Sequence, residues 1–364
     1  MTRRRFIAKA GAVVAAAAGA AATVHAPAVI AQQRYRWRMP TTWTPALDIM
    51  QGSAQRLARI VGELSAGRLT IEVFPAGQIV PPLGVFDACS KGTVEAFMGA
   101  SYYWAAKEPA VQWFCAVPFG MNPSGMHSWL NHAEGLKLWE ETYAAFGLVP
   151  RPGVSTGPQM AGWFRRQINS LADFKGLKMR IPGLGGQVVA RAGGTVVLTP
   201  GGEIYGALER GVIDASEWVG PHDDMKLGLP KTAPYYYYPG WHEPGTTLEF
   251  TFNKKAYDSL PVELRHVLDY AASAVALYGT TEYEARNAVA LERLRSEYKG
   301  KIEVLQLPAA VLKDLKKSAA EVVRAEADKS PMAKKVYASF SRFQAQIAGW
   351  HGISEGAFHQ HVAL

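Results

Sequence analysis

Strand-like and helix-like segments alternate through the first third of this chain, and this alternation restricts its fold more than any other feature. Residues 35–39 alternate like a strand, and the apolar residues of 47–64 recur at helical spacing. A strand over 69–74, a short helix over 83–90 and a strand over 94–98 follow. A β-α-β-α-β order is typical of an α/β fold with a substantially parallel sheet.

The alternation resumes in a second block. The apolar patterns predict strands over 159–164, 177–181, 196–198 and 213–219, with helices over 184–192 and 202–210. We expect the strand over 248–252 to return to the first block. From Pro261 the chain is predicted to be helical to its end, interrupted by a short strand over 302–305.

The N-terminus has the pattern of a twin-arginine export signal. Consecutive arginines at positions 3–5 precede Phe6, Ile7 and Lys9, and an Ala/Gly/Val-rich run over 10–24 follows. Small residues near Ala31 predict cleavage before Gln32. The alternative is an uncleaved membrane anchor, but the run is alanine-rich and shorter than a membrane span. We therefore expect the mature protein, from residue 32, to be periplasmic and exported folded.

The charge of the mature chain argues against a nucleic-acid partner. The whole chain has 39 basic and 31 acidic residues, a formal charge of +8. Four basic residues leave with the signal, so 35 remain against 31 acidic ones, a balance of +4. No basic run remains that would follow a phosphate backbone. Hydrophobic residues at 48% and charged residues at 19% are typical of a globular protein.

The sequence contains no recognisable catalytic or transition-metal motif. CxxC, HExxH, zinc-type Cys/His spacing and Gly-x-Ser-x-Gly are all missing, and the glycines of 183–186 lack the spacing of a phosphate loop, which indicates a tight turn. The only cysteines are Cys89 and Cys115. They can form a disulfide or remain as two buried free thiols.

Two polar positions at predicted strand ends are candidate binding residues. Arg180 precedes Pro182, and an arginine at the carboxyl end of a strand suits a carboxylate ligand, although many such arginines are solvated. Glu217 and Trp218 end an apolar strand and place a charge beside an aromatic wall, or form a structural ion pair. Gln159 adds a neutral oxygen.

Apolar residues in the last hundred residues form two stripes with steps of four and three. The simpler interpretation is that these stripes pack on the protein's own sheet, and the alternative is that they dock on a second copy of the protein. The stripes are Leu264, Leu268, Ala271, Val275, Tyr278 and Val336, Phe340, Phe343, Ile347, Trp350.

Three motifs together resemble one family. They are residues 178–182 (KMRIP), 201–214 (GGEIYGALERGVID) and 252–261 (FNKKAYDSLP). In this order they resemble the solute-binding proteins of tripartite ATP-independent periplasmic (TRAP) transporters, over essentially the whole mature chain. The resemblance implies a two-lobed α/β periplasmic binding protein with mixed, mostly parallel sheets, a hinge and long C-terminal helices.

The resemblance also implies a division of the chain. Residues 1–31 are the signal peptide, and lobe 1 comprises 32–155 with about 248–285. Lobe 2 comprises 156–247. The C-terminal helical region, 286–364, packs on the lobes and is a candidate for the dimer contact.

The finer resemblance is to the branch that binds 2-oxo monocarboxylates such as pyruvate together with a metal ion. It assigns the ligand carboxylate to Arg180, and the cation to Gln159, Glu217 and the carbonyl of Trp218. Further positions that resemble this branch are Tyr102 and Tyr103 in the cleft wall and Glu243 as an added metal ligand, whereas His242 departs from the pattern.

Charge counting supports a cation independently of the resemblance. Glu217 and a carboxylate ligand are two negative groups, and Arg180 balances one of them. The ligands are hard oxygens, which suit Na⁺ or Ca²⁺, and no organic cofactor is expected.

The sequence therefore predicts a receptor without a chemical step that delivers its ligand to a membrane permease and forms a homodimer. A 2-hydroxy acid such as lactate with Ca²⁺ is an open alternative. The second alternative belongs to a different functional class: an exported enzyme that carries a cofactor.

Overall fold

The computed structural model describes residues 33–362, and the predicted signal peptide lies outside them. Residues from Tyr35 onward group as one compact unit, so the boundaries between the expected lobes stay a prediction. Among residues 33–362, no helix combines the length and the apolar character needed to cross a membrane.

The predicted β-α-β-α-β order opens the structure. Its elements are β1 (Tyr35–Pro40), α2 (Met50–Leu64), β2 (Leu69–Phe74), α3 (Val85–Ser90) and β3 (Ala96–Gly99). β1 and β2 run parallel, and a parallel bridge between Thr41 and Met98 connects the end of β1 with β3. Leu57 and Val61 on the apolar face of α2 are fully buried, which explains its amphipathic pattern, whereas Leu64 at its end is exposed.

β10 (Thr247–Asn253) returns to this region, as expected from the sequence. It lies between β3 and β4 (Leu148–Ser155) and is antiparallel to both. The sequence did not predict β4 or the two helices before it, α4 (Pro123–His132) and α5 (Gly135–Ala144). β4 contains two prolines, which obscure a strand pattern.

The second block forms a six-stranded mixed sheet with the order β11-β9-β5-β8-β6-β7. Within it β6 is parallel to β7 and β8, and β5 is antiparallel to β8 and β9. The strands are short: β5 (Gly162–Phe164), β6 (Lys178–Arg180), β7 (Thr195–Val197), β8 (Ala215–Ser216), β9 (Tyr235–Tyr238) and β11 (Glu303–Gln306). Its helices are α6 (Gly183–Arg191), α7 (Gly201–Glu209) and α8 (Pro221–Lys226).

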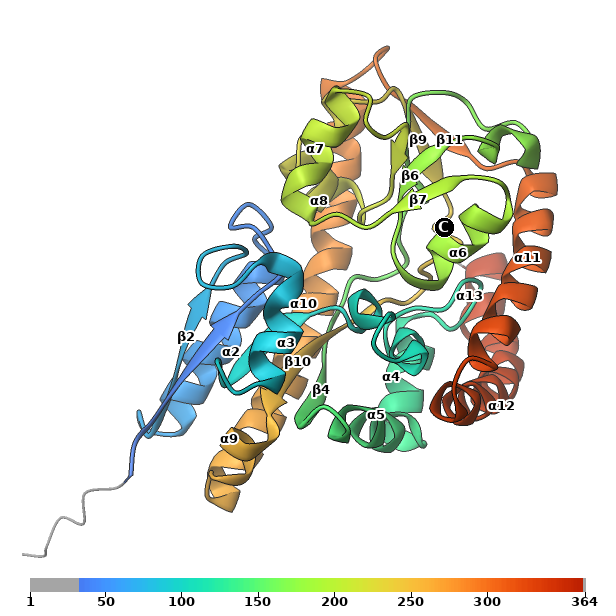
Figure 1. Cartoon of the computed structure of the whole chain (residues 1–364). Helices are drawn as coiled ribbons and strands as arrows, with labels where there is room; N and C mark the ends of the chain where they lie inside the picture. The colour runs from blue at the N-terminus through green and yellow to red at the C-terminus, as the bar shows by residue number, and fades with distance from the viewer. Residues whose placement is uncertain (1–32, 363–364) are drawn as a thin grey trace, which may run out of the picture. The chain divides into compact units, whose positions relative to one another are not determined.

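Long helices complete the chain, as the sequence predicted. After the short α9 (Lys254–Asp258), α10 (Val262–Glu297) packs on β4 and α2 and also on α8 (Figure 1). α10 therefore connects the three-stranded region with elements of the second block. It is followed by α11 (Ala309–Ala327), α12 (Pro331–Ile353) and α13 (Glu355–His361), and α11 and α12 lie side by side.

The two apolar stripes have different surroundings. In α10, Leu264, Leu268, Ala271 and Val275 are buried inside the chain's own core. Most of that stripe therefore packs within the protein itself, as the simpler interpretation predicted. In α12, Val336 and Phe340 are buried, but Trp350 is 63% exposed. The distal end of the second stripe is therefore uncovered.

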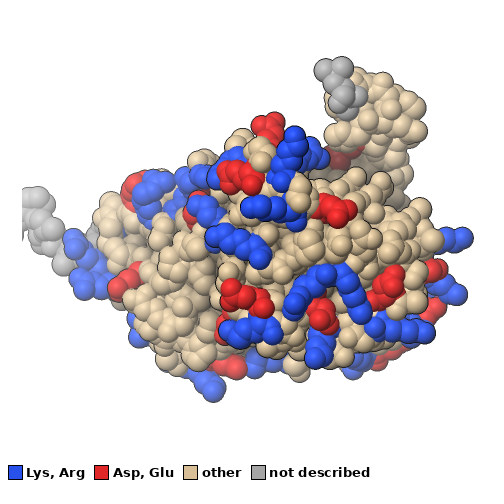
Figure 2. All heavy atoms as spheres, turned by 90° about the horizontal axis from the view of Figure 1, so that it is seen from above, with Lys and Arg blue, Asp and Glu red and all other residues tan. Residues whose placement is uncertain are grey.

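Cys89 and Cys115 are buried free thiols and do not form the disulfide that the sequence left open. Burial raises the pKa of each thiol well above its usual value, which keeps them protonated. On the face shown in Figure 2, Lys and Arg side chains lie among Asp and Glu side chains, without a continuous field of one sign.

Candidate functional site

Arg180 ends β6 inside the six-stranded sheet and is 1% exposed, so it is not a solvated surface residue. Met179 and Ile181, its neighbours in the chain, are also buried. The Nε atom of Arg180 donates a hydrogen bond of 3.2 Å to the carbonyl oxygen of Thr199, beyond β7. Its guanidinium carbon lies 5.1 Å from the ring centroid of Trp218. The side chain is thus fixed by contacts on two sides.

Sheet register brings Glu217 to Arg180. β8 runs parallel to β6 with Ser216 opposite Arg180, so the next residue, Glu217, emerges at the same edge. The Nη1 atom of Arg180 forms an ion pair with Oε1 of Glu217, and both side chains are 1% exposed. Burial raises the pKa of Glu217 to about 7, and the ion pair with Arg180 acts in the opposite direction.

Gln159 and Glu243 form a second polar group at this edge. The Nε2 atom of Gln159 donates to Oε2 of Glu243 and to Oγ1 of Thr156, each at 2.9 Å. The hydroxyl of Thr246 donates to the same Glu243 oxygen at 2.5 Å. Burial raises the pKa of Glu243 to about 7. The two threonines were not singled out in the sequence: Thr156 precedes the predicted strand over 159–164, and Thr246 precedes the one over 248–252.

His242 lies against the carboxylate of Glu217. Its Nε2 atom is 3.4 Å from Oε2 of Glu217, and burial lowers the pKa of His242 to about 4, so the ring is neutral at pH 7. Glu217, His242 and Glu243 each offer one ligand atom, and these atoms lie within 4.8 Å of one another. His242, to which the sequence assigned no role, is therefore part of the polar cluster.

An aromatic wall closes the site. Tyr102 and Tyr103 belong to a 3-10 turn over Ser101–Trp104, and Trp43 lies 6.3 Å from Tyr103 and 6.4 Å from Trp218 between ring centroids. Trp43 was not identified in the sequence as a site residue, because an isolated tryptophan after a strand is usually core. Together these residues line a small cavity: Trp43, Met50, Tyr102, Tyr103, Thr156, Gln159, Arg180, Trp218, Val219 and Leu248.

Unpaired buried atoms show which groups the site can accept. Within residues 33–362, Oε1 of Gln159 and Nη2 of Arg180 are buried and have no hydrogen-bond partner. A buried acceptor without a donor suits a cation, and a buried guanidinium donor suits a carboxylate. The residues therefore fit a cation with hard-oxygen ligands beside an organic acid.

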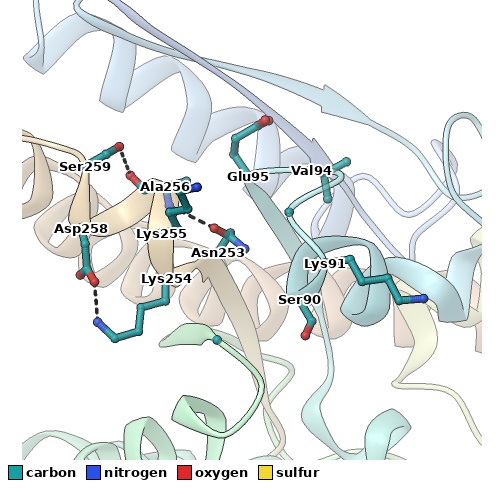
Figure 3. Close-up of a pocket in the computed structure, with 12 residues that line it drawn as sticks. Ser90, Lys91, Val94, Glu95, Asn253, Lys254, Lys255, Ala256, Asp258 and Ser259 are labelled. Atoms are coloured by element: carbon teal, nitrogen blue, oxygen red, sulfur yellow. Dashed lines mark hydrogen bonds and ion pairs between the residues drawn. The ribbon is translucent and has the colours of Figure 1, made fainter.

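A much larger surface groove lies elsewhere, between α3 and α9 (Figure 3). Within this groove Lys254 pairs with Asp258, and the side chain of Asn253 caps α9 by accepting from the backbone N–H of Ala256. Its lining mixes lysines with acidic residues and holds no converging polar cluster like that at Arg180. The small buried cavity is therefore the better candidate.

Comparison with protein families gives one match over most of the chain. Residues 40–330 match the bacterial extracellular solute-binding protein family 7. A protein of Nostoc sp. named monocarboxylate 2-oxoacid-binding periplasmic protein is 43% identical over 320 residues, which is 88% of this chain and 87% of the relative.

Two solved structures are similar over nearly their full length. One is a TRAP periplasmic solute-binding protein from Colwellia psychrerythraea with bound calcium and pyruvate. It is 39% identical, with a TM-score of 0.87, and the match covers 90% of this chain and 99% of that one. The other, from Pseudoalteromonas atlantica with bound sodium and pyruvate, is 39% identical with a TM-score of 0.88, covering 91% and 100%.

Proposed function

This chain belongs to the bacterial extracellular solute-binding proteins of family 7, and we propose that it is a TRAP transporter receptor for a small 2-oxo monocarboxylate. It works in the periplasm and binds pyruvate or a similar acid together with Na⁺ or Ca²⁺. The named relative and the two pyruvate-bound structures support this assignment. The observation that carries it is the buried guanidinium of Arg180, with a free donor, beside uncharged and acidic oxygens.

The residues divide between the two components of the ligand. Arg180 binds the carboxylate, while Tyr102, Tyr103 and Trp218 enclose the small organic part. The cation is held by Oε1 of Gln159, the carboxylates of Glu217 and Glu243, and the carbonyl oxygen of Trp218. A bound cation supplies positive charge that offsets the carboxylates and gives the 2-oxo oxygen a ligand position.

Binding requires movement between two lobes, because the site residues are buried. Arg180, Glu217, His242 and Glu243 are each at most 3% exposed, so the groups proposed to contact the ligand are almost wholly covered. The proposed lobes are 32–155 with about 248–285, and 156–247. Closure around the ligand, without a chemical step, is the expected receptor action. The closed receptor then delivers its ligand to the membrane permease.

We also propose a homodimer through the C-terminal helices. Apolar side chains remain uncovered along α12 and α13, and scattered single exposures would be ordinary, but these follow one another along a continuous stretch. They are Trp350, Ile353, Phe358 and Val362, with exposed fractions of 63%, 75%, 53% and 64%.

Thermal-shift screening of ligand-stripped protein tests the ligand class. The panel comprises 2-oxo, 2-hydroxy and dicarboxylic acids, each with Na⁺, Ca²⁺ or a chelator, because a ligand that binds only the folded state raises its melting temperature. Pyruvate with a cation is expected to give the largest shift. A larger shift with lactate and Ca²⁺ would reassign the ligand. A stoichiometric transition metal or flavin in the purified protein would instead favour an enzyme.

A further inference from the structure

The two opposite charges at the centre of the site neutralise each other. Arg180 Nη1 pairs with Oε1 of Glu217 and lies 3.5 Å from the carbonyl oxygen of the same residue. Both side chains are almost wholly buried. If an anion bound to Arg180 without a cation, Glu217 would remain as an uncompensated buried charge next to that anion. If a cation bound to Glu217 without an anion, its charge would lie beside the unpaired guanidinium of Arg180. Either outcome is costly in a buried site.

The surroundings hold both side chains in place while their partners change. Nε of Arg180 stays on the carbonyl of Thr199, and its Nη2 atom is free among the described residues. On the other side, Oε2 of Glu217 faces His242 Nε2 rather than the arginine. Glu243 is held separately, by Gln159 and Thr246. Only the contact between Arg180 and Glu217 has to open.

We propose that Arg180 and Glu217 exchange partners when the ligand binds, so that anion and cation enter as a coupled pair. The ligand carboxylate replaces Glu217 on Arg180, and the cation replaces Arg180 on Glu217. This inference rests on the proposed function and goes beyond it, because a site can bind both components without coupling them. Each component removes the charge that opposes the other.

Coupling of this kind is reciprocal, which gives a measurement on the wild-type protein. The factor by which Ca²⁺ tightens pyruvate binding must equal the factor by which pyruvate tightens Ca²⁺ binding. We expect this factor to be at least about tenfold, within the usual range of coupling between two ligands. Isothermal titration calorimetry of each component, with and without the other, in a buffer whose only other cation is a bulky organic amine, measures both factors.

The variant Glu217→Gln separates exchange from simple metal ligation. With the internal partner of Arg180 neutralised, the variant should bind pyruvate without added cation at least about threefold more tightly than the wild type does without cation. Added Ca²⁺ should tighten pyruvate binding by the variant by a smaller factor than it does for the wild type. If Glu217 were only a cation ligand, the cation-free affinities of the variant and the wild type would be equal.

Glu326→Gln is the matched control, because Glu326 is also a buried carboxylate but pairs with Gln112 and Lys329 away from the site. It should retain the wild-type coupling. If the affinity of the wild type for pyruvate did not change with added cation, the proposed exchange would be wrong, but the receptor assignment would remain. Cation-free binding by Glu217→Gln that is no tighter than wild type would overturn it as well. Failure to bind any 2-oxo acid in any cation would overturn both.

Discussion

At the scale of single residues, Arg180 combines full burial with an unused donor, so its geometry matters as much as its charge. Arg180→Lys keeps the charge but loses the planar fork that matches a carboxylate. We expect pyruvate affinity to fall at least roughly 30-fold, equivalent to about 2 kcal/mol for a buried charged contact. Calorimetry measures this, with the exposed Arg59→Lys as control. An affinity within threefold of wild type would remove Arg180 from the carboxylate site.

Glu249 is a buried carboxylate outside the proposed ligand set. It accepts hydrogen bonds from Nε1 of Trp104 at 2.6 Å and from the hydroxyl of Thr251 at 2.7 Å, and burial raises its pKa to about 7. The folded state therefore holds this proton at pH values where the unfolded chain has lost it. Its contribution to stability is present below about pH 4 and is lost as the pH rises through about 7.

Glu249→Gln should remove this part of the pH dependence. Between pH 5 and pH 8 the unfolding free energy of the wild type should fall more than that of the variant, by a difference on the order of 2 kcal/mol. Urea denaturation at the two pH values gives the comparison. Parallel pH profiles for the two proteins would mean that Glu249 is ionised in the fold throughout this range.

The sequence located the residues that now lie together, but it did not reveal how they pair. Arg180 and Glu217 stand at the ends of two recognisable strands, so their proximity follows once β6 and β8 are neighbours. The contacts of His242 and Trp43 depend on loops, whose positions are set by tertiary packing that no local pattern records. The roles of all these residues in binding stay proposals.

At the scale of elements, the sequence predicted what has a clear period. The β-α-β order, the return of β10 and the C-terminal helices were all found from apolar spacing. β4 and β9 were missed for local reasons. β4 is interrupted by prolines, and β9 is a run of four tyrosines in which no alternation is visible.

Gly279 sets how closely α10 approaches its neighbours. A Cβ atom there would lie 2.6 Å from Cγ2 of Val154 in β4 and 3.1 Å from the hydroxyl of Ser53 in α2. Gly279→Ala should therefore destabilise the fold by about 1–3 kcal/mol through overpacking, despite the better helix propensity of alanine. Gly62→Ala in α2 is the control, because nothing lies within 4 Å of its Cβ position. It should stabilise by about 0.5–1 kcal/mol. Equal melting temperatures for both variants would contradict this packing.

At the scale of the whole molecule, the uncovered apolar side chains of α12 and α13 predict self-association. Wild-type protein at micromolar concentration should have the mass of a dimer by light scattering. Ile353→Asp, at a position 75% exposed, should yield a folded monomer, because a buried charge at an apolar contact is costly. A wild-type mass of one chain, unchanged by ligand, would refute the dimer but not the receptor.

The receptor assignment itself depends on one binding equilibrium. Calorimetric titration of ligand-stripped wild-type protein with pyruvate, in saturating Ca²⁺ and separately in saturating Na⁺, tests it most directly. The account predicts one pyruvate bound per chain with at least one of these cations, and no comparable binding of a dicarboxylic acid such as 2-oxoglutarate. An absence of pyruvate binding with both cations, in protein that melts cooperatively, would contradict it.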